Sequence, residues 1–432
     1  MIWRILPLAS SLVIAVPATA QTPVTGPTLP ADPETAATGA AAPPEIIDLQ
    51  TVLRLAQTAN PRIAADEQQI AGARADRITA GALPNPSVSY FGNYQPGRDT
   101  NFTGRQAHEA RVELPLLLGG QRRARIFGAD RRIDAARSHV AATRLEIATD
   151  AGVAFVALLA AQETIGLRRR AVAELDRLRT IVAGRRSSGE ASDYDLVRVD
   201  VEVESTRAEL AGAEADLISA QADLSNALGI SGWHPEASGQ LDGLVQRPIE
   251  GRRAVDELPS VAAAIADERV ARADVVTARR ERFPKVSVNG GRFWTPVPYG
   301  QTFYAGVSLE VPLFDRRIGP VRKAEADACA AEFRTQVAKA RAMSEIDRYA
   351  AQVDTRSNAL AIFNRRIGAK LPSLGRMAED AYRLRGGSVI ELIDATRSRF
   401  DNEVVRIDLS SKLAEAMLRL ELAQGNAPDS RP

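Results

Sequence analysis

Apolar residues recur at a helical spacing through the middle of the first half of the chain. They return every seven residues, at Ile126, Ile133, Val140 and Ile147. The repeat resumes after a four-residue step at Ala151, and no proline occurs between residues 121 and 235. Heptads interrupted by a four-residue step are typical of a locally unwound coiled coil. The pattern predicts one helix of about 65 residues, ending near 185–189.

Elsewhere apolar and polar residues alternate, which predicts strands. In the stretch TFYAGVSLEV the odd positions from Phe303 to Val311 are apolar and most even positions are polar. Similar alternation predicts four strands, near 86–94, 105–114, 285–294 and 302–311. Proline is tolerated at a strand end and disturbs a continuing helix. Four prolines therefore mark the expected junctions of strands with helices: Pro86, Pro115, Pro284 and Pro312.

These elements occur twice at a nearly constant offset. VELPLLLGG, from Val112, is matched by LEVPLFDRR, from Leu309, and Pro86 precedes Pro284 by about 198 residues. Such self-similarity is a sign of internal duplication. We predict a first helix–strand–strand–helix repeat at 48–230, a connector at 231–255, a second repeat at 256–425 and a tail at 426–432.

The shorter helices follow the same plan in both halves. Each repeat is expected to begin with a helix of about 30 residues, at 48–81 and 255–282. Each ends with a helix after a glycine-containing turn, at 192–228 and 388–424. By analogy with the first half, a second long helix is expected at 319–385. Two short helices placed end to end match the length of one long helix and could flank it.

The N-terminus resembles a secretory signal. Arg4 precedes an apolar stretch at 5–16, and PATA precedes Gln21, so we predict a signal peptide at 1–20. The segment 21–47, rich in proline and alanine, is expected to be an extended leader. Past the signal, no apolar run comes near the roughly 18 residues that a spanning helix needs. We therefore expect export without a transmembrane helix.

Composition argues against several classes of function. The net charge of +1 does not favour nucleic acid as a partner. Cys329 is the only cysteine, and the three histidines lie too far apart in sequence for a zinc motif. The chain has no glycine-rich phosphate loop and no G-x-S-x-G motif. We expect a non-enzymatic protein that needs no cofactor and holds no metal.

The strands favour a membrane barrel built from several copies. Of the 21 aromatic residues, ten lie at 85–115 or 284–314, and aromatic girdles are typical of such barrels. A soluble core of two sheets is the alternative. Four strands cannot close a barrel, and lipid does not tolerate an open edge. Two copies would supply eight strands and three would supply twelve, with room for water; four copies remain open.

Several motifs resemble TolC-type outer-membrane efflux proteins. LPNPSVSY, VELPLLLGGQRRARI and GVSLEVPLFDRRIG are most similar to the CzcC heavy-metal branch. The resemblance implies a mixed α and β fold in which a long α-helical coiled-coil barrel continues a transmembrane β-barrel. It implies a homotrimer, twelve strands, a Gram-negative outer membrane and a long periplasmic portion. It also implies a periplasmic adaptor, an inner-membrane resistance-nodulation-division pump and a passive conduit for metal cations.

Two turns between long helices are the candidate functional regions. In the second, Glu391 and Asp394 are three residues apart and should share a helix face. The TolC family narrows its periplasmic entrance with two acidic residues ahead of an A-T pair, and ELIDAT matches that pattern. A ring of six carboxylates from three copies would form a cation-attracting gate. Replacing both residues with alanine should make the pore leakier.

The first turn offers an equivalent acidic pair, Asp193 and Asp195. For all four acidic residues the alternative is an ordinary helix N-terminus, where the helix dipole favours negative charge. The turns themselves are candidates for adaptor contact, at Ser187, Ser188, Gly189, Gly386, Gly387 and Ser388. A plain turn is the alternative for these.

Two other functions fit the same pattern. The duct could serve drugs or other small organic molecules, because selection of cargo belongs mainly to pump and adaptor. A periplasmic coiled-coil scaffold without a channel is the alternative from another class. A duct should need detergent for extraction, whereas a soluble scaffold should leave the cell on osmotic shock.

Overall fold

The computed structural model describes residues 43–94, 106–246, 251, 253–294, 300–384 and 387–426. The predicted signal peptide, most of the predicted leader and nearly all of the tail lie outside these residues. The chain divides into two units, Met1–Pro44 and Glu45–Pro432. The helices and strands below all belong to the second unit.

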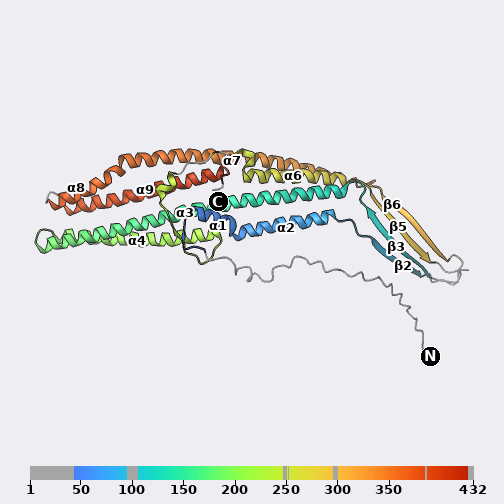
Figure 1. The fold of residues 1–432 in the computed structure, drawn as a ribbon, viewed down its shortest axis with the longest axis horizontal. Coiled ribbons are helices and arrows are strands. Elements are labelled where there is room, and N and C mark those ends of the chain that lie inside the picture. Colours follow the sequence, from blue (N-terminus) through green and yellow to red (C-terminus); the bar gives the residue numbers. More distant parts are fainter. Residues whose placement is uncertain are drawn as a thin grey trace, which may run out of the picture. The chain divides into compact units, whose positions relative to one another are not determined.

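The longest element is α3, which spans Gln121–Ser187. Its 67 residues extend for about 100 Å at 1.5 Å per residue. α2 (Pro61–Gly81) packs along α3 near its beginning. α4 (Asp193–Leu228) packs along its later part, so two shorter helices flank the long one (Figure 1).

The first short helix is divided, against the prediction of one helix at 48–81. α1 covers Leu49–Thr58 and α2 begins at Pro61. Pro61 has no N–H to continue a helix, and the side chain of Asn60 accepts a hydrogen bond of 2.9 Å from the Arg62 N–H. An asparagine cap followed by proline is a strong helix start. The break therefore follows directly from the residues.

The second long helix is also broken, so the prediction of a helix at 319–385 is wrong. α7 covers Ile318–Arg366, a short 3₁₀ turn covers Gly368–Lys370, and α8 covers Leu371–Arg383. In a continuous helix the ring of Pro372 would collide with the carbonyl of residue 368. α3 contains no proline and stays intact. α6 (Pro259–Arg280) and α9 (Val389–Ala423) complete the second half.

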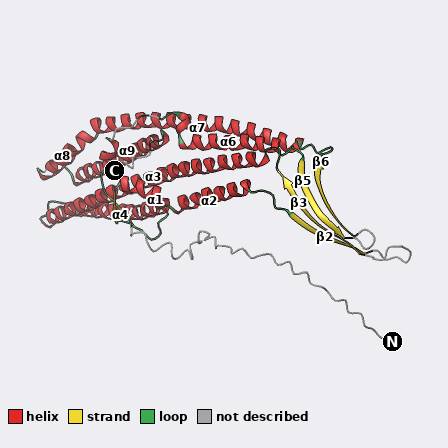
Figure 2. Cartoon of the chain, turned by 45° about the vertical axis from the view of Figure 1, so that its right-hand side comes forward, coloured by secondary structure: helices red, strands yellow, loops and turns green. Residues whose placement is uncertain are grey.

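Four antiparallel strands form one sheet in the order β2-β3-β5-β6 (Figure 2). They span Ser87–Tyr94, Gln106–Leu116, Lys285–Trp294 and Gln301–Glu310. β3 pairs with β5, which joins the two halves of the chain directly. Among the described residues the outer edges of β2 and β6 have no partner strand.

The connector between the halves packs against the helices. β4 (Glu236–Ala237) pairs in parallel with β1 (Ile46–Ile47), and α5 spans Leu241–Val245. Backbone N–H groups of the connector donate to side chains of α3, from Ala237 to Gln162 and from Leu241 to Glu163, both at 2.9 Å. These bonds fasten the connector to the long helix.

Among the described residues, α3 is the helix that bears on the prediction about membrane spans. By length and composition, it contains a window apolar enough to cross a membrane, and half of that window is buried. Phe155 and Leu158 of α3 lie in a core formed with α1, α4 and α9. This burial marks α3 as a core helix.

Gly229 ends α4 in the left-handed region, with φ of 71°. A Cβ at this position would lie 2.7 Å from Cδ of Pro61, at the start of α2. We expect Gly229→Ala to lower the thermal unfolding midpoint in detergent, because it adds a clash of roughly 1–3 kcal/mol to the backbone strain.

Gly232→Ala is the matched control for this change. Gly232 has φ of 70° with no neighbouring heavy atom within 4 Å of an added Cβ. The change Gly232→Ala therefore introduces the backbone strain without the clash. Equal decreases in the midpoint for the two variants would contradict the proposed contact with Pro61.

Candidate functional site

The turn between α3 and α4 is built by hydrogen bonds from serine and by glycine. The hydroxyls of Ser187 and Ser188 donate to the carbonyl of Gly184 at 2.7 and 3.1 Å. Gly189 follows with φ of 73°, a left-handed conformation that suits glycine. These contacts terminate α3 and allow the chain to reverse.

α4 and α9, the helices that follow the two candidate turns, each begin with a capping box. At α4 the Asp195 N–H donates to the hydroxyl of Ser192 at 3.1 Å, and the Ser192 N–H donates to Asp195 at 2.9 Å. At α9 the Glu391 N–H donates to the hydroxyl of Ser388 at 3.2 Å, and the Ser388 N–H donates to Glu391 at 3.1 Å. The starts of α4 and α9 are therefore capped in the same way.

The four predicted gate carboxylates have different surroundings. Glu391 and Asp394 are both exposed on α9, while Leu392 and Ile393 between them are buried. Asp193 forms an ion pair with Arg186, and Asp195 is engaged in its capping box. Among the described residues, no ion pair or hydrogen bond joins the pair on α4 to the pair on α9.

The ends of the two hairpins meet through contacts that the sequence did not predict. The guanidinium of Arg185 lies 4.2 Å from the ring centroid of Tyr382 and donates to the Tyr382 carbonyl at 3.1 Å. Val182 of α3 and Val199 of α4 also pack in one apolar cluster with Ile393 of α9. Gly387 and Ser388 belong to the adjacent turn, whereas Gly386 lies outside the described residues. The two turns thus form one surface region.

One face of the sheet is polar. Glu109, Arg111 and Glu113 alternate along β3, and Arg111 donates to the hydroxyl of Tyr304 on β6 at 3.0 Å. The hydroxyl of Tyr304 donates to Glu109 at 2.5 Å. To contact Arg111, the side chain of Tyr304 crosses β5 over Gly291. A Cβ added at Gly291 would lie 2.6 Å from the Tyr304 hydroxyl. A network of charged and hydroxyl groups therefore spans three strands.

The opposite face of the sheet is mostly apolar and exposed, and it also carries His108 and Arg292. The strand register places Val112 beside Val88, and Leu114 in one row with Val288 and Val307. Large side chains exposed on this face occur on all four strands: Val88, Tyr90, Val112, Leu114, Val288, Phe303, Val307 and Leu309. The sheet thus presents an apolar surface on one side and a hydrogen-bonded polar surface on the other.

The predicted junction prolines lie at or near strand ends. Pro86 and Pro284 immediately precede β2 and β5, and Pro312 follows the end of β6 by two residues. Pro115 lies inside β3, paired with Ser287, so this strand extends past the predicted end at 114. Pro86, Pro284 and Pro312 thus lie just outside the strands, whereas Pro115 is the second-last residue of β3.

A carboxylate ties three helices together at this junction. Glu281, at the end of α6, accepts hydrogen bonds from Arg125 of α3 at 2.7 Å and from Arg317 at the start of α7 at 2.7 Å. Burial raises the pKa of the Glu281 carboxyl, but the hydrogen bonds and charges of Arg125 and Arg317 outweigh burial and lower it overall.

Replacing Glu281 with glutamine is expected to reduce thermal stability at neutral pH. The folded-state pKa is depressed, so the stabilisation is complete above the ordinary value of about 4.3 and is lost as pH falls through the lower folded value. Thermal midpoints of the two proteins should therefore converge as the pH falls below about 4.3. The control is Glu325→Gln, which removes the more exposed pair with Arg279. A difference between wild type and Glu281→Gln that persists at low pH would refute this ionic origin.

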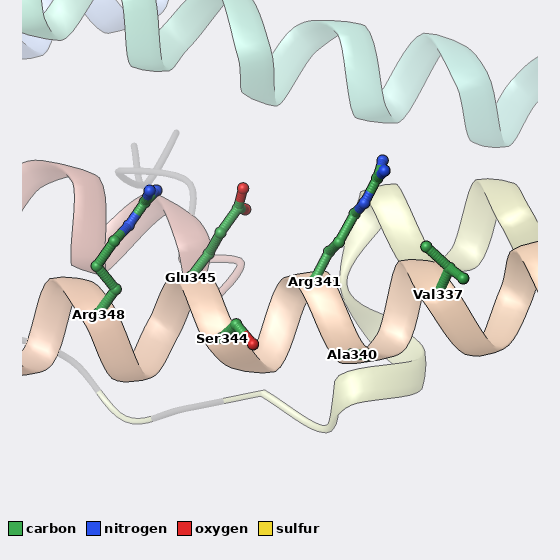
Figure 3. Close-up of a pocket in the computed structure, with 6 residues that line it drawn as sticks. All are labelled: Val337, Ala340, Arg341, Ser344, Glu345 and Arg348. Carbon is green, nitrogen blue, oxygen red and sulfur yellow. The ribbon is translucent and has the colours of Figure 1, made fainter.

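Other side chains offer little for chemistry. Within the described ranges, no group of three or more histidine, cysteine, aspartate or glutamate side chains could hold a metal ion. A surface cavity of about 350 Å³ on α7 is lined by Arg341, Glu345 and Arg348, which extend to one side of the helix (Figure 3). Its described lining has a single carboxylate, too few donors for a metal site.

The chain matches a known family over most of its length. A family model described as outer membrane efflux protein matches residues 52–230 and 252–426. The two matched segments correspond to the two halves of the chain, on either side of the connector.

Two curated relatives are resistance proteins. The chain is 28% identical over 276 residues to the cobalt-zinc-cadmium resistance protein CzcC of Cupriavidus metallidurans, covering 63% of this chain and 65% of CzcC. It thus spans slightly less than two thirds of that relative. It is 23% identical over 297 residues to the nickel-cobalt-cadmium resistance protein NccC of Alcaligenes xylosoxydans xylosoxydans, covering 68% of this chain and 67% of NccC.

Solved structures share the fold. A membrane protein from Pseudomonas aeruginosa aligns with a TM-score of 0.74 at 22% identity, covering 87% of this chain and 93% of that chain. CusC, from a study of transmembrane channel formation, aligns with a TM-score of 0.74 at 17% identity, covering 90% and 95%. Together the comparisons confirm the resemblance to TolC-type efflux proteins and to the CzcC branch.

Proposed function

Since the chain belongs to the outer membrane efflux protein family, we propose that it is the outer-membrane duct of a tripartite, proton-driven efflux system. The duct is passive: it lets heavy-metal cations leave the periplasm or cytoplasm for the outside. Zinc, cadmium, cobalt or copper is the proposed cargo. Its own residues perform no covalent chemistry.

The two-faced sheet is the observation that best supports this proposal. An apolar face on all four strands suits contact with lipid, and a polar opposite face suits a water-filled interior. Lipid does not tolerate the open edges of β2 and β6. We propose that three copies join these edges into a twelve-stranded barrel, with room for water inside.

The helices and the turns between them are proposed to form the periplasmic part of the duct. The helices continue from the sheet for about 100 Å, a length suited to crossing the periplasm as a helical barrel. We propose that the turns at 187–189 and 386–388 contact a periplasmic adaptor, which links the duct to an inner-membrane resistance-nodulation-division pump. Glu391 and Asp394, with Asp193 and Asp195, are the proposed gate at that end.

Metals are the proposed cargo because of the relatives. Both curated relatives are named for resistance to cobalt and cadmium, one with zinc and one with nickel. A passive conduit should not bind its cargo tightly, and exposed carboxylates such as Glu391 and Asp394 attract cations weakly and reversibly. Duct and gate therefore suit transit of a cation.

Removal of the protein from its own cells tests the cargo. Retained zinc, cadmium, cobalt and copper should rise, while export of a fluorescent dye stays normal. Dye retention with normal metal levels would instead make this a duct for organic molecules. Re-expression of the full chain is the control and should restore metal export.

Cell fractionation tests the duct itself. The protein should sediment with outer membranes and require detergent for extraction. Its release with the osmotic-shock fluid would contradict a membrane duct and favour a periplasmic scaffold.

A further inference from the structure

A cavity of about 250 Å³ lies where the sheet meets the helices of the second half. One wall is the connection from α6 to β5, with Arg282, Phe283 and Pro284. The other wall is the connection from β6 to α7, which runs from Val311 to Arg317. Neither the proposed gate nor the proposed adaptor contact uses this cavity.

The second wall continues the apolar face of the sheet. Val307 and Leu309 are exposed on that face, and the alternation continues past the strand to Val311 and Leu313, 55% and 66% exposed. Phe314 is 101% exposed. A fully exposed aromatic ring beside an apolar surface is expected at a site that contacts lipid or another apolar partner. The apolar face therefore leads directly into the cavity.

The carboxylates that line the cavity are already engaged. Glu281 binds Arg125 and Arg317, Glu310 lies 3.2 Å from Lys285, and Asp315 accepts a hydrogen bond of 2.8 Å from the Arg317 N–H. Among the described residues, by contrast, the exposed guanidinium of Arg282 forms no ion pair. A guanidinium with no ion-pair partner among the described residues thus lies beside an apolar wall.

We infer that this cavity binds an anionic glycerophospholipid, with its phosphodiester at Arg282 and an acyl chain against Val311, Leu313 and Phe314. The inference rests on the proposed function: in a duct whose helices enter the periplasm, this junction lies at the level of the inner-leaflet headgroups. An anionic lipid is favoured over phosphatidylethanolamine because the ammonium would need a carboxylate, and those present are engaged. Arginine is well suited to phosphate.

Lipid retention measured by native mass spectrometry tests this site. The full chain, purified in detergent, is incubated with phosphatidylglycerol, phosphatidylethanolamine or phosphatidylcholine of equal acyl length. Wild type is expected to retain phosphatidylglycerol several-fold more than either zwitterionic lipid. Equal retention of all three lipids by wild type would overturn the inference and needs no variant.

Two variants locate the site. Arg282→Gln should remove the preference for phosphatidylglycerol, and Phe314→Ala should weaken retention of all three lipids. Arg280→Gln is the matched control, because Arg280 is in the same region but does not line the cavity. Unchanged preference in Arg282→Gln would overturn the inference, as would an equal loss in Arg280→Gln.

Failure of the lipid site can be distinguished from failure of the proposed function. A wild-type protein that sediments with outer membranes yet shows no lipid preference would overturn this site alone, including the case in which a neighbouring copy covers the cavity. A protein that never associates with membranes would overturn the duct as well.

Discussion

Channels carrying Glu391→Gln with Asp394→Asn are expected to conduct several-fold more than wild type in planar bilayers and to lose preference for cations. In the proposed trimer, these residues place six carboxylates around one axis. Such a ring is expected to attract cations and, in the closed state, to be bridged by arginine side chains. Neutral amides would weaken both effects, so the closed state should become less populated.

Glutamine and asparagine are better replacements than alanine here. Glu391 accepts a hydrogen bond from the Ser388 N–H at 3.1 Å, so Glu391→Ala would remove a helix cap together with a charge. Loss of a cap costs roughly 1 kcal/mol, whereas glutamine can keep the capping box. The amide variant therefore isolates the charge.

The control removes the same number of charges elsewhere. Glu345→Gln with Asp354→Asn changes two exposed carboxylates of α7, far along the chain from the turn. It should leave conductance and ion preference close to wild type. If the variant at 391 and 394 also behaves as wild type, the gate is wrong and Glu391 serves as a helix cap.

Lysine on the apolar face of the sheet should prevent assembly in the outer membrane. Val307→Lys places a charge on the face proposed to contact lipid, where Val307 is 72% exposed. Near the middle of the bilayer such a charge costs roughly 2–4 kcal/mol, and each copy in the barrel contributes one. We expect little protein in the outer-membrane fraction and little of the assembled oligomer on unheated gels.

The neighbouring residue supplies the control. Ser308→Lys changes the next position of the same strand, which faces the polar side in register with Ser287. A charge there should be tolerated because water hydrates it. Equal assembly of the two variants would contradict a lipid-facing apolar surface, and a reversed result would exchange the two faces.

The errors in the sequence predictions concern proline. Pro61 and Pro372 both interrupt helices that were predicted as continuous. Both breaks could have been predicted from the sequence, because proline lacks the N–H that a helix interior requires. The capping boxes were likewise visible, as SDYD from Ser192 is followed at a similar offset by SVIE from Ser388.

Other contacts could not be predicted from the chain alone. Arg185 and Tyr382 are far apart in sequence, and their contact depends on how two hairpins pack. The role of Gly291 depends on Tyr304, which reaches over it toward Arg111. No periodicity distinguishes that glycine from one in an ordinary strand. Such contacts require the register between strands.

By itself, the sequence determined the kinds of element and their duplication. Periods of seven and of two residues are local properties, so they report helix and strand wherever they occur. The tertiary structure alone decided that β3 pairs with β5, which aligns the apolar residues of both halves on one face. It also decided which carboxylates are engaged and which are exposed. The physical reason is that strand register and helix packing depend on contacts between distant residues, which local periodicity does not encode.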